Sequence, residues 1–268
     1  MFGARRRVLP AALLLFAAIA PTAWAEDDAE LQKKLSNPIA DLVTVPFQWT
    51  TTAGVGPFER PQHALNIQPV YPVKLGKALL INRAIVPILS NPGATPGQDR
   101  ATGLGDITYE AFFVPPSSGG LLWGAGPILQ LRTASNDQLG SGKWAAGPAF
   151  VVVTQPDPWT VGVLLTQRWS FAGDDQRAKV NETEIQPVLS YRLNARHTLS
   201  YAGTIRADWE QSRASQRWTV PLGATYSTLV RHGSMPVNYI VGAGYNVIRP
   251  DGGGDWSVRV QVNFILAK

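Results

Sequence analysis

The sequence contains no cysteine among its 268 residues. A chain without cysteine cannot be cross-linked by disulfides, so its stability must come from hydrogen bonding and packing. Histidine is also scarce, with three residues that stand far apart. Zinc sites are built from clusters of Cys and His, so this composition predicts no resident metal or cofactor.

Long hydrophobic runs are missing beyond residue 25, where no stretch offers 18 consecutive apolar residues. A spanning helix needs about 20, so membrane insertion would have to use strands. Residues 1–25 combine Arg5, Arg6 and Arg7 with an apolar stretch too short to span and a small-residue end at Ala23-Trp24-Ala25. This pattern predicts a secretory signal peptide, with a mature chain that begins near Glu26.

The mature chain also has little net charge. Removing the three arginines of residues 1–25 lowers the formal charge from +5 to +2. The basic character of the whole sequence therefore comes largely from the predicted signal peptide, and it indicates no nucleic-acid partner.

An alternation of polar and apolar side chains organises residues 181–209. Charged and polar residues occupy every even position of 182–192 except Val188, and aliphatic or aromatic residues occupy most odd positions. After a turn at 193–196, the same alternation continues over 198–209. A period of two indicates strands, and strands of about ten residues on short turns are typical of a transmembrane barrel.

The remaining chain repeats this pattern and predicts an all-β transmembrane antiparallel up-and-down barrel of about twelve strands. The expected strands are 43–53, 62–73, 77–89, 103–114, 120–132, 143–155, 158–170, 181–192, 197–209, 216–229, 236–248 and 255–267. Longer polar connections alternate with short turns, as extracellular loops alternate with periplasmic turns. The predicted domains are the signal peptide (1–25), a short periplasmic helix that forms a plug segment (26–42) and the barrel (43–268).

Tryptophans fall at the ends of the predicted strands. Six lie beside the long connections and two follow short turns: Trp49, Trp144, Trp169, Trp209, Trp218 and Trp256, then Trp123 and Trp159. Amphipathic rings at both edges of an apolar band form an aromatic girdle, which the core of a soluble sandwich would not require.

Prolines inside the predicted strands oppose this interpretation, because proline cannot donate to a ladder. The sequence therefore predicts β-bulges or kinks at Gly126-Pro127 and Gly147-Pro148.

Ten charged residues on the predicted inner face are candidate lumen or selectivity residues. They are Asp106, Glu110, Arg132, Arg168, Glu182, Glu184, Arg206, Asp208, Arg217 and Arg259. All but Glu110, which is deeper, lie in the half of their strands nearest the long loops. They could form a constriction, because rings of charge set pore selectivity. They could equally form a self-neutralising network that fills a narrow lumen, and the balance of signs argues against strong ion selectivity.

The segment before the first strand and the histidines leave alternatives open. Residues 26–41 could insert into the lumen as a plug, cap the periplasmic mouth or form a loose tail. An outer-membrane lipase would need a nucleophile beside a histidine at the rim. His63 is the histidine near that edge, but Leu65 stands where the lipase pattern requires serine. A non-conducting structural barrel is the remaining alternative.

Several segments resemble a family of bacterial outer-membrane proteins, the MetA-type proteins of phenol degradation. The matching stretches include 35–41, 46–48, 65–70, 103–107, 139–144, 169–174, 217–221 and 246–250. This resemblance implies an outer-membrane channel or transporter, in a Gram-negative bacterium, for passive passage of small, hydrophobic or aromatic solutes. The expected partners are outer-membrane lipid, a small-molecule solute and, during biogenesis, the barrel-assembly machinery.

Overall fold

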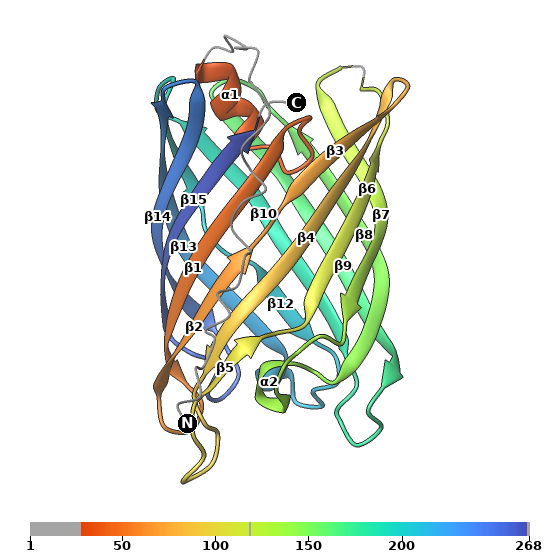
Figure 1. Cartoon of the computed structure of the whole chain (residues 1–268), viewed down its shortest axis with the longest axis vertical. Coiled ribbons are helices and arrows are strands. Elements are labelled where there is room, and N and C mark those ends of the chain that lie inside the picture. Colours follow the sequence, from red (N-terminus) through yellow and green to blue (C-terminus); the bar gives the residue numbers. More distant parts are fainter. Residues whose placement is uncertain (1–27, 118, 267–268) are drawn as a thin grey trace, which may run out of the picture.

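The chain folds into a closed antiparallel barrel of twelve strands, as the sequence predicts (Figure 1). The computed structural model describes residues 28–117 and 119–266, so the predicted signal peptide lies outside the described residues. Closure depends on the pairing of the last strand with the first, which runs from Val43 opposite Leu266 to Thr52 opposite Ser257. This pairing leaves no strand at an open edge of the sheet, which is the condition for crossing lipid.

Fifteen strand segments make up the sheet. They are β1 (Val43–Val55), β2 (Arg60–Ile67), β3 (Val70–Leu75), β4 (Ala78–Asn91), β5 (Ala101–Leu104), β6 (Ile107–Val114), β7 (Leu121–Leu131), β8 (Lys143–Thr154), β9 (Trp159–Gly173), β10 (Asn181–Arg192), β11 (His197–Tyr201), β12 (Ile205–Asp208), β13 (Trp218–His232), β14 (Met235–Ile248) and β15 (Trp256–Leu266). The helices are α1 (Asp28–Leu35), α2 (Ala214–Arg217) and a 3-10 turn, η1 (Asp137–Leu139). None of the helices in the described residues is long and apolar enough to span a membrane.

Three of the predicted strands are interrupted, so the expectation of twelve continuous strands was wrong there. β2 and β3 are separated at Gln68-Pro69, β5 and β6 at Gly105-Asp106, and β11 and β12 at residues 202–204. The pairing register of β10 continues across the last break, from Ser190 opposite Ser200 to Ile185 opposite Ile205. Pro187 of β10 faces this break, and because it has no N–H the ladder cannot be completed on that side.

The irregularity predicted at Gly126-Pro127 and Gly147-Pro148 is not a β-bulge at either position. Pro127 lies directly opposite Pro148, and the register between β7 and β8 is constant along the whole pair. A Cβ on Gly126 would lie 1.8 Å from the Ala111 carbonyl oxygen, and one on Gly147 would lie 1.9 Å from that of Gln167. Each glycine therefore accommodates a close approach of the neighbouring backbone, while the proline after it leaves a hydrogen bond unmade without shifting the register.

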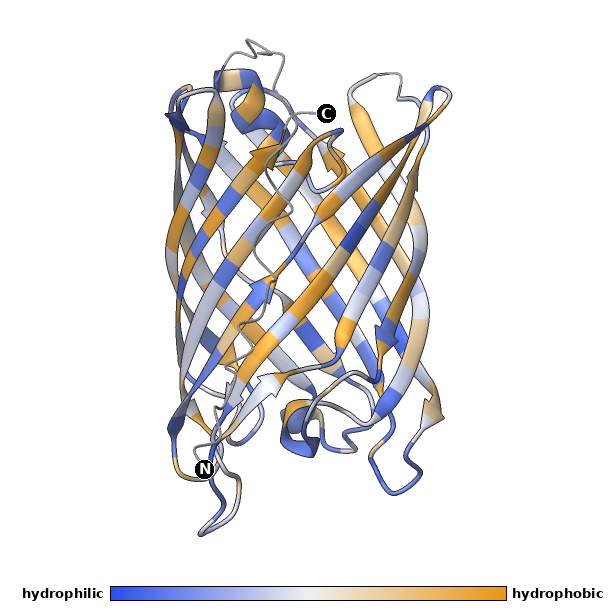
Figure 2. Ribbon diagram, in the orientation of Figure 1, coloured by the Kyte–Doolittle hydropathy of each residue, from blue (hydrophilic) through white to orange (hydrophobic). Residues whose placement is uncertain are grey.

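The outer face carries the aromatic residues expected of a lipid-facing surface. Seven tryptophans expose at least 40% of their surface: Trp49, Trp123, Trp144, Trp159, Trp169, Trp209 and Trp256. Figure 2 shows hydrophobic and hydrophilic residues alternating along the strands, with hydrophilic residues gathered in the loops. This arrangement agrees with the aromatic girdle that the sequence predicts.

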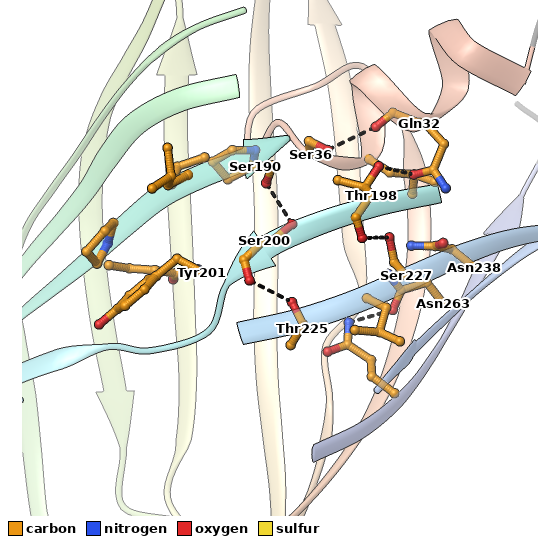
Figure 3. A pocket seen from close by; sticks show the side chains of 18 residues that line it. Gln32, Ser36, Ser190, Thr198, Ser200, Tyr201, Thr225, Ser227, Asn238 and Asn263 are labelled. Atoms are coloured by element: carbon orange, nitrogen blue, oxygen red, sulfur yellow. Dashed lines mark hydrogen bonds between the residues drawn. The ribbon is translucent and has the colours of Figure 1, made fainter. Parts of the chain in front are cut away.

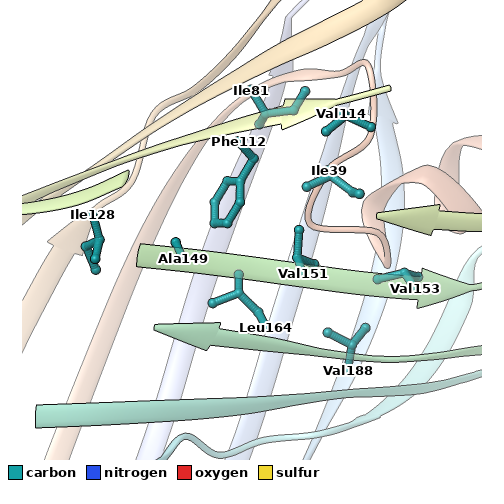
Figure 4. Packing of buried hydrophobic residues seen from close by; sticks show 10 residues of the cluster. All are labelled: Ile39, Ile81, Phe112, Val114, Ile128, Ala149, Val151, Val153, Leu164 and Val188. Carbon is teal, nitrogen blue, oxygen red and sulfur yellow. The ribbon is translucent and has the colours of Figure 1, made fainter. Parts of the chain in front are cut away.

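The inner face differs from the uniformly polar lumen that the alternation predicts. One side of the lumen is an apolar wall, which we define by the buried side chains of Ile81, Phe112, Val114, Ile128, Ala149, Val151, Val153, Leu164 and Val188 (Figure 4). These residues come from β4 and β6 through β10, and Ile39 of the segment before β1 packs against them. The expectation of a polar lumen therefore fails at this wall, although the same strands carry the charged candidates Glu110, Arg168, Glu182 and Glu184 nearer to the long loops.

Candidate lumenal site

A four-residue charge cluster lies on the lumenal faces of β9, β10 and β12. Strand pairing sets Arg168 opposite Glu182 and Arg206 opposite Glu184. The Arg168 Nη2 lies 2.8 Å from Glu184 Oε1 and 3.1 Å from Glu182 Oε1. The Arg206 Nε completes the cluster at 3.2 Å from Glu184 and 3.8 Å from Glu182. Two guanidinium groups therefore neutralise two carboxylates across three adjacent strands.

A second ion pair extends this polar region across the lumen. Arg83 of β4 lies 3.4 Å from the Glu110 carboxylate and donates to Gln68 Oε1 at 3.0 Å. Arg83 was missing from the sequence-based candidates. Asn82 and Arg83 are consecutive in the strand, so their side chains point to opposite faces of the sheet. Asn82 instead accepts a hydrogen bond from the Tyr109 hydroxyl at 2.6 Å. Glu110 thus has a lumenal counter-ion that strand parity could have identified.

Asp106 has a structural position at the end of the barrel that carries the long loops. Its carboxylate accepts hydrogen bonds from the Ser141 amide (2.7 Å) and hydroxyl (2.8 Å), and from the amides of Thr133 and Ala134 at 3.2 Å. Both ends of the 132–142 loop are therefore fastened to one carboxylate. Gln130 connects the loop held by Asp106 to the charge cluster. Its amide nitrogen donates to the Ser141 hydroxyl at 2.8 Å, and its amide oxygen accepts from Arg168 Nη1 at 3.2 Å.

The other predicted lumen residues are not brought into the charge cluster. Arg132 is exposed just beyond the end of β7. Asp208 accepts from the Glu210 amide within its own turn, at 3.0 Å. Arg217 ends α2 and places its guanidinium 5.0 Å from the Trp209 ring centroid. Arg259 of β15 is lumenal, opposite Gly242, and within the described residues it has neither a hydrogen-bond partner nor an ion pair.

Helix α1 lies across the mouth at the end of the short turns (Figure 1). Leu31 packs with Leu229 and Ile265 in a buried cluster. The buried Gln32 side chain donates to the Arg196 carbonyl at 2.7 Å, and Gln155 donates to the Lys33 carbonyl at 2.7 Å. Barrel residues therefore hold the helix through both apolar packing and hydrogen bonds.

Asp28 fastens the first turn of α1 to two arginines of the barrel turns. Its carboxylate accepts from Arg196 Nε at 2.8 Å and from Arg231 Nε at 2.7 Å. The hydrogen bond from Arg196 lowers the pKa of Asp28 below its ordinary value of 3.8, and Arg231 adds to this effect, while burial opposes it. The carboxylate is therefore ionised at neutral pH and paired with both cations.

His63, the residue on which a lipase would depend, lies on the outer face near the rim that carries the long loops. Its ring stacks on Trp49 with centroids 5.7 Å apart, and its Nδ1 lies 3.0 Å from the Thr51 hydroxyl oxygen. The same hydroxyl accepts a hydrogen bond from Trp49 Nε1 at 3.1 Å. The group within hydrogen-bond distance of His63 is therefore the hydroxyl of Thr51, which also binds Trp49 of the aromatic girdle. As for metals, the part of the chain that the structure describes contains no group of three His, Asp or Glu side chains suited to hold one.

A family model described as "Putative MetA-pathway of phenol degradation" matches residues 36–265. A search of curated proteins by sequence gave no match. Among solved structures, the barrel is similar to the COG4313 outer membrane channel from Pseudomonas putida F1, with a TM-score of 0.61 and 15% identity over 84% of this chain and 94% of that one. It is also similar to the NanC porin, with a TM-score of 0.56 and 10% identity over 84% of this chain and 100% of that one. At these identities, the similarity extends to the fold.

Proposed function

The chain belongs to this phenol-degradation family of outer-membrane barrels, and from that premise we propose that it passes small, neutral, hydrophobic or aromatic solutes across the outer membrane. Passage would be passive, down the concentration gradient of the solute. The observation that carries the proposal is the apolar wall inside the barrel.

An apolar wall inside a barrel is unusual for a channel that serves hydrophilic solutes. Porin lumens are polar and filled with water. Here Val151 and Val153 are completely buried, and Phe112 and Ile128 each expose 1% of their surface. These side chains pack against one another and against Ile39. Removing apolar solute surface from water contributes roughly 25 cal/mol per Å², so an apolar solute that displaces Ile39 would be stabilised by contact with this wall.

The lumenal charges support the same class of solute. Arg168 and Arg206 are matched by Glu182 and Glu184, and Arg83 is matched by Glu110. Paired charges leave a weak net field, so the lumen does not strongly favour ions of either sign. The cluster then serves mainly as a polar filling that narrows the lumen, which is one of the two interpretations that the sequence left open.

Segment 28–41 would act as a plug at the periplasmic end. Its helix is held at the mouth by Asp28, Leu31 and Gln32, and Ile39 covers part of the apolar wall. A solute that leaves through this end must displace the segment or pass beside it, so the plug would limit the rate of passage.

A rim enzyme and a non-conducting structural barrel are less well supported. The hydroxyl beside His63 is already engaged by Trp49, and no serine stands two residues after the histidine. Nucleophilic catalysis needs a nucleophile that the base is free to activate. A purely structural barrel would not need an apolar wall on the inner side of the sheet.

Uptake by whole cells tests the proposal. Gram-negative cells that express the chain should accumulate labelled toluene faster than cells without it, while labelled xylose should enter at the same rate in both. Exchanging Val151 and Val153 for threonine adds two hydroxyls to the wall with little change in shape and should reduce the toluene rate. Arg132→Gln, at an exposed loop position, serves as the control. Toluene uptake that is equal with and without the chain would refute the proposal.

A further inference from the structure

A cavity of about 220 Å³ lies in the lumen directly beside α1 (Figure 3). Its walls come from α1, the segment after it and the lumenal side of β10, β11, β13, β14 and β15. For comparison, an apolar cavity of about 150 Å³ in another protein binds benzene. The space therefore suits a molecule of roughly ten non-hydrogen atoms.

The lining of this cavity is polar but carries no charge. Twelve of its residues bear a hydroxyl or amide side chain: Gln32, Ser36, Gln186, Ser190, Thr198, Ser200, Tyr201, Thr225, Ser227, Asn238, Gln261 and Asn263. Among the described residues that line it, none is Asp, Glu, Lys, Arg or His. An ionised ligand would have to leave water without a counter-ion, which is strongly unfavourable. The ligand of this cavity should therefore be neutral.

The polar groups of the lining do not fully satisfy one another's hydrogen-bonding capacity. Ser200 donates to Ser190 at 2.9 Å, but Thr225 and Ser227 reach their carbonyl acceptors only at 3.5 Å. The Asn238 side chain is buried, with 3% of the residue exposed, and its Oδ1 has no hydrogen-bond partner. A buried acceptor left unsatisfied costs about 1–3 kcal/mol, so a ligand that donates a hydrogen bond there would be stabilised.

Apolar groups of the cavity lining complete the specificity. Pro187, Val188 and Ile240 contribute hydrocarbon surface beside the amides and hydroxyls. Val188 also belongs to the apolar wall, so this cavity adjoins the route proposed above for apolar solutes. A ligand with an apolar body and one hydroxyl would satisfy both sides, because a hydroxyl both donates and accepts.

We propose that this cavity is a binding subsite for a neutral, hydroxyl-bearing small molecule, with Asn238 as the residue that recognises the hydroxyl. The subsite rests on the proposed function, because it would be a station on the solute path. It refines that function by separating alcohols from hydrocarbons and from carboxylates of the same size.

The test is equilibrium binding to the refolded full barrel, followed by fluorine NMR with three probes of matched size. These are 4-fluorobenzyl alcohol, 4-fluorotoluene and 4-fluorobenzoate. The alcohol should bind most tightly. Asn238→Leu should weaken binding of the alcohol by about fivefold to tenfold, which corresponds to the loss of one hydrogen bond. The affinity for 4-fluorotoluene should stay unchanged.

Asn66→Leu is the matched control, because Asn66 lies on the lumenal face of β2 opposite Gln48 and outside the cavity lining. If Asn238→Leu does not refold, Ser227→Ala removes another polar group of the cavity lining and can be tested with the same three probes. Equal affinities for the three probes, or an alcohol affinity that neither variant lowers, would overturn the subsite. A cavity that holds only water would bind none of the probes, and this result would overturn the subsite as well. Cells that still take up toluene in that case would show that the subsite fails while the channel proposal stands.

Discussion

At the scale of single residues, strand parity predicts which side chains face the lumen but cannot predict their partners. Parity correctly placed Arg168, Glu182, Glu184 and Arg206 on one face, and strand register then made them neighbours. It could not distinguish Asp106, which fastens a loop, from a charge that faces the lumen. That distinction depends on loop conformation, which a period of two does not encode.

Thr166 and Thr160 of β9 offer a matched test of lumenal packing. The Thr166 hydroxyl is buried without a hydrogen-bond partner, whereas the Thr160 hydroxyl accepts from Gln155 at 3.0 Å. Thr166→Val should raise the free energy of unfolding by about 1 kcal/mol, and Thr160→Val should lower it by a similar amount. Urea unfolding, followed by heat-modifiable migration on gels, measures both. A loss of stability in Thr166→Val would show that its hydroxyl has a partner.

Arg206 and Arg168 test whether the charge cluster narrows the lumen. In a protein that lacks residues 26–36, Arg206→Ala or Arg168→Ala should raise single-channel conductance, because a long side chain is removed. Either variant should also shift the reversal potential toward cation preference, because Glu182 and Glu184 lose a counter-ion. Arg132→Ala, outside the strands, is the control. Unchanged conductance in both cluster variants would rule out a constriction.

At the scale of elements, the sequence located every strand but not the interruptions within three of them. Alternation and turn residues are local signals, whereas a break such as 202–204 arises because Pro187 on the neighbouring strand cannot donate. The helix before the first strand was also expected. Its docking site could not be predicted, because the contacts of Gln32 and Leu31 involve residues more than 160 positions away.

Gly147 and Gly244 of the barrel test the close approach of strands. A Cβ at position 147 would meet the Gln167 carbonyl oxygen at 1.9 Å, while one at position 244 would have its nearest neighbours at 3.3 Å (the Ser257 hydroxyl) and 3.4 Å (the Leu222 carbonyl oxygen). Gly147→Ala should therefore lower the free energy of unfolding by about 3 kcal/mol or prevent refolding. Gly244→Ala should refold with nearly unchanged stability. Comparable urea midpoints for the two variants would contradict this packing.

Docking of α1 should depend on pH through Asp28. The folded pKa is lower than the ordinary value of 3.8, so the ion pairs stabilise docking above that pH. This stabilisation is lost as the pH falls through the lowered pKa, because the protonated carboxyl no longer pairs with Arg196 and Arg231. Asp28→Asn should weaken the docking of α1 at neutral pH, and it should abolish the further loss of docking at acidic pH.

A single label can follow this docking, because the chain has no native cysteine. A fluorophore on Glu30→Cys, an exposed position of α1, reports helix mobility by its anisotropy. Anisotropy should be constant from neutral pH down to 3.8 and fall below it. The same acid transition in the Asp28→Asn protein would assign the effect to another group.

At the scale of the whole molecule, barrel closure and the two faces of the sheet follow from composition and period. The lack of cysteine and of long apolar runs left strands as the means of spanning, and the last strand pairs with the first as a closed barrel requires. The apolar wall within the lumen could not be predicted from the alternation. A strand that is apolar on both faces reads as a continuous apolar run, such as Phe150 to Val153, and this run hides the alternation.

The solute path that we propose runs through the lumen, and segment 28–41 closes its periplasmic end. Single-channel conductance in a planar bilayer tests this central claim most directly, with refolded residues 26–268 compared against the same protein without residues 26–36. The deletion removes α1 and its contacts at the mouth, so it should give discrete current steps that are larger than those of the intact barrel. Two folded, heat-modifiable barrels with identical conductance would contradict the claim.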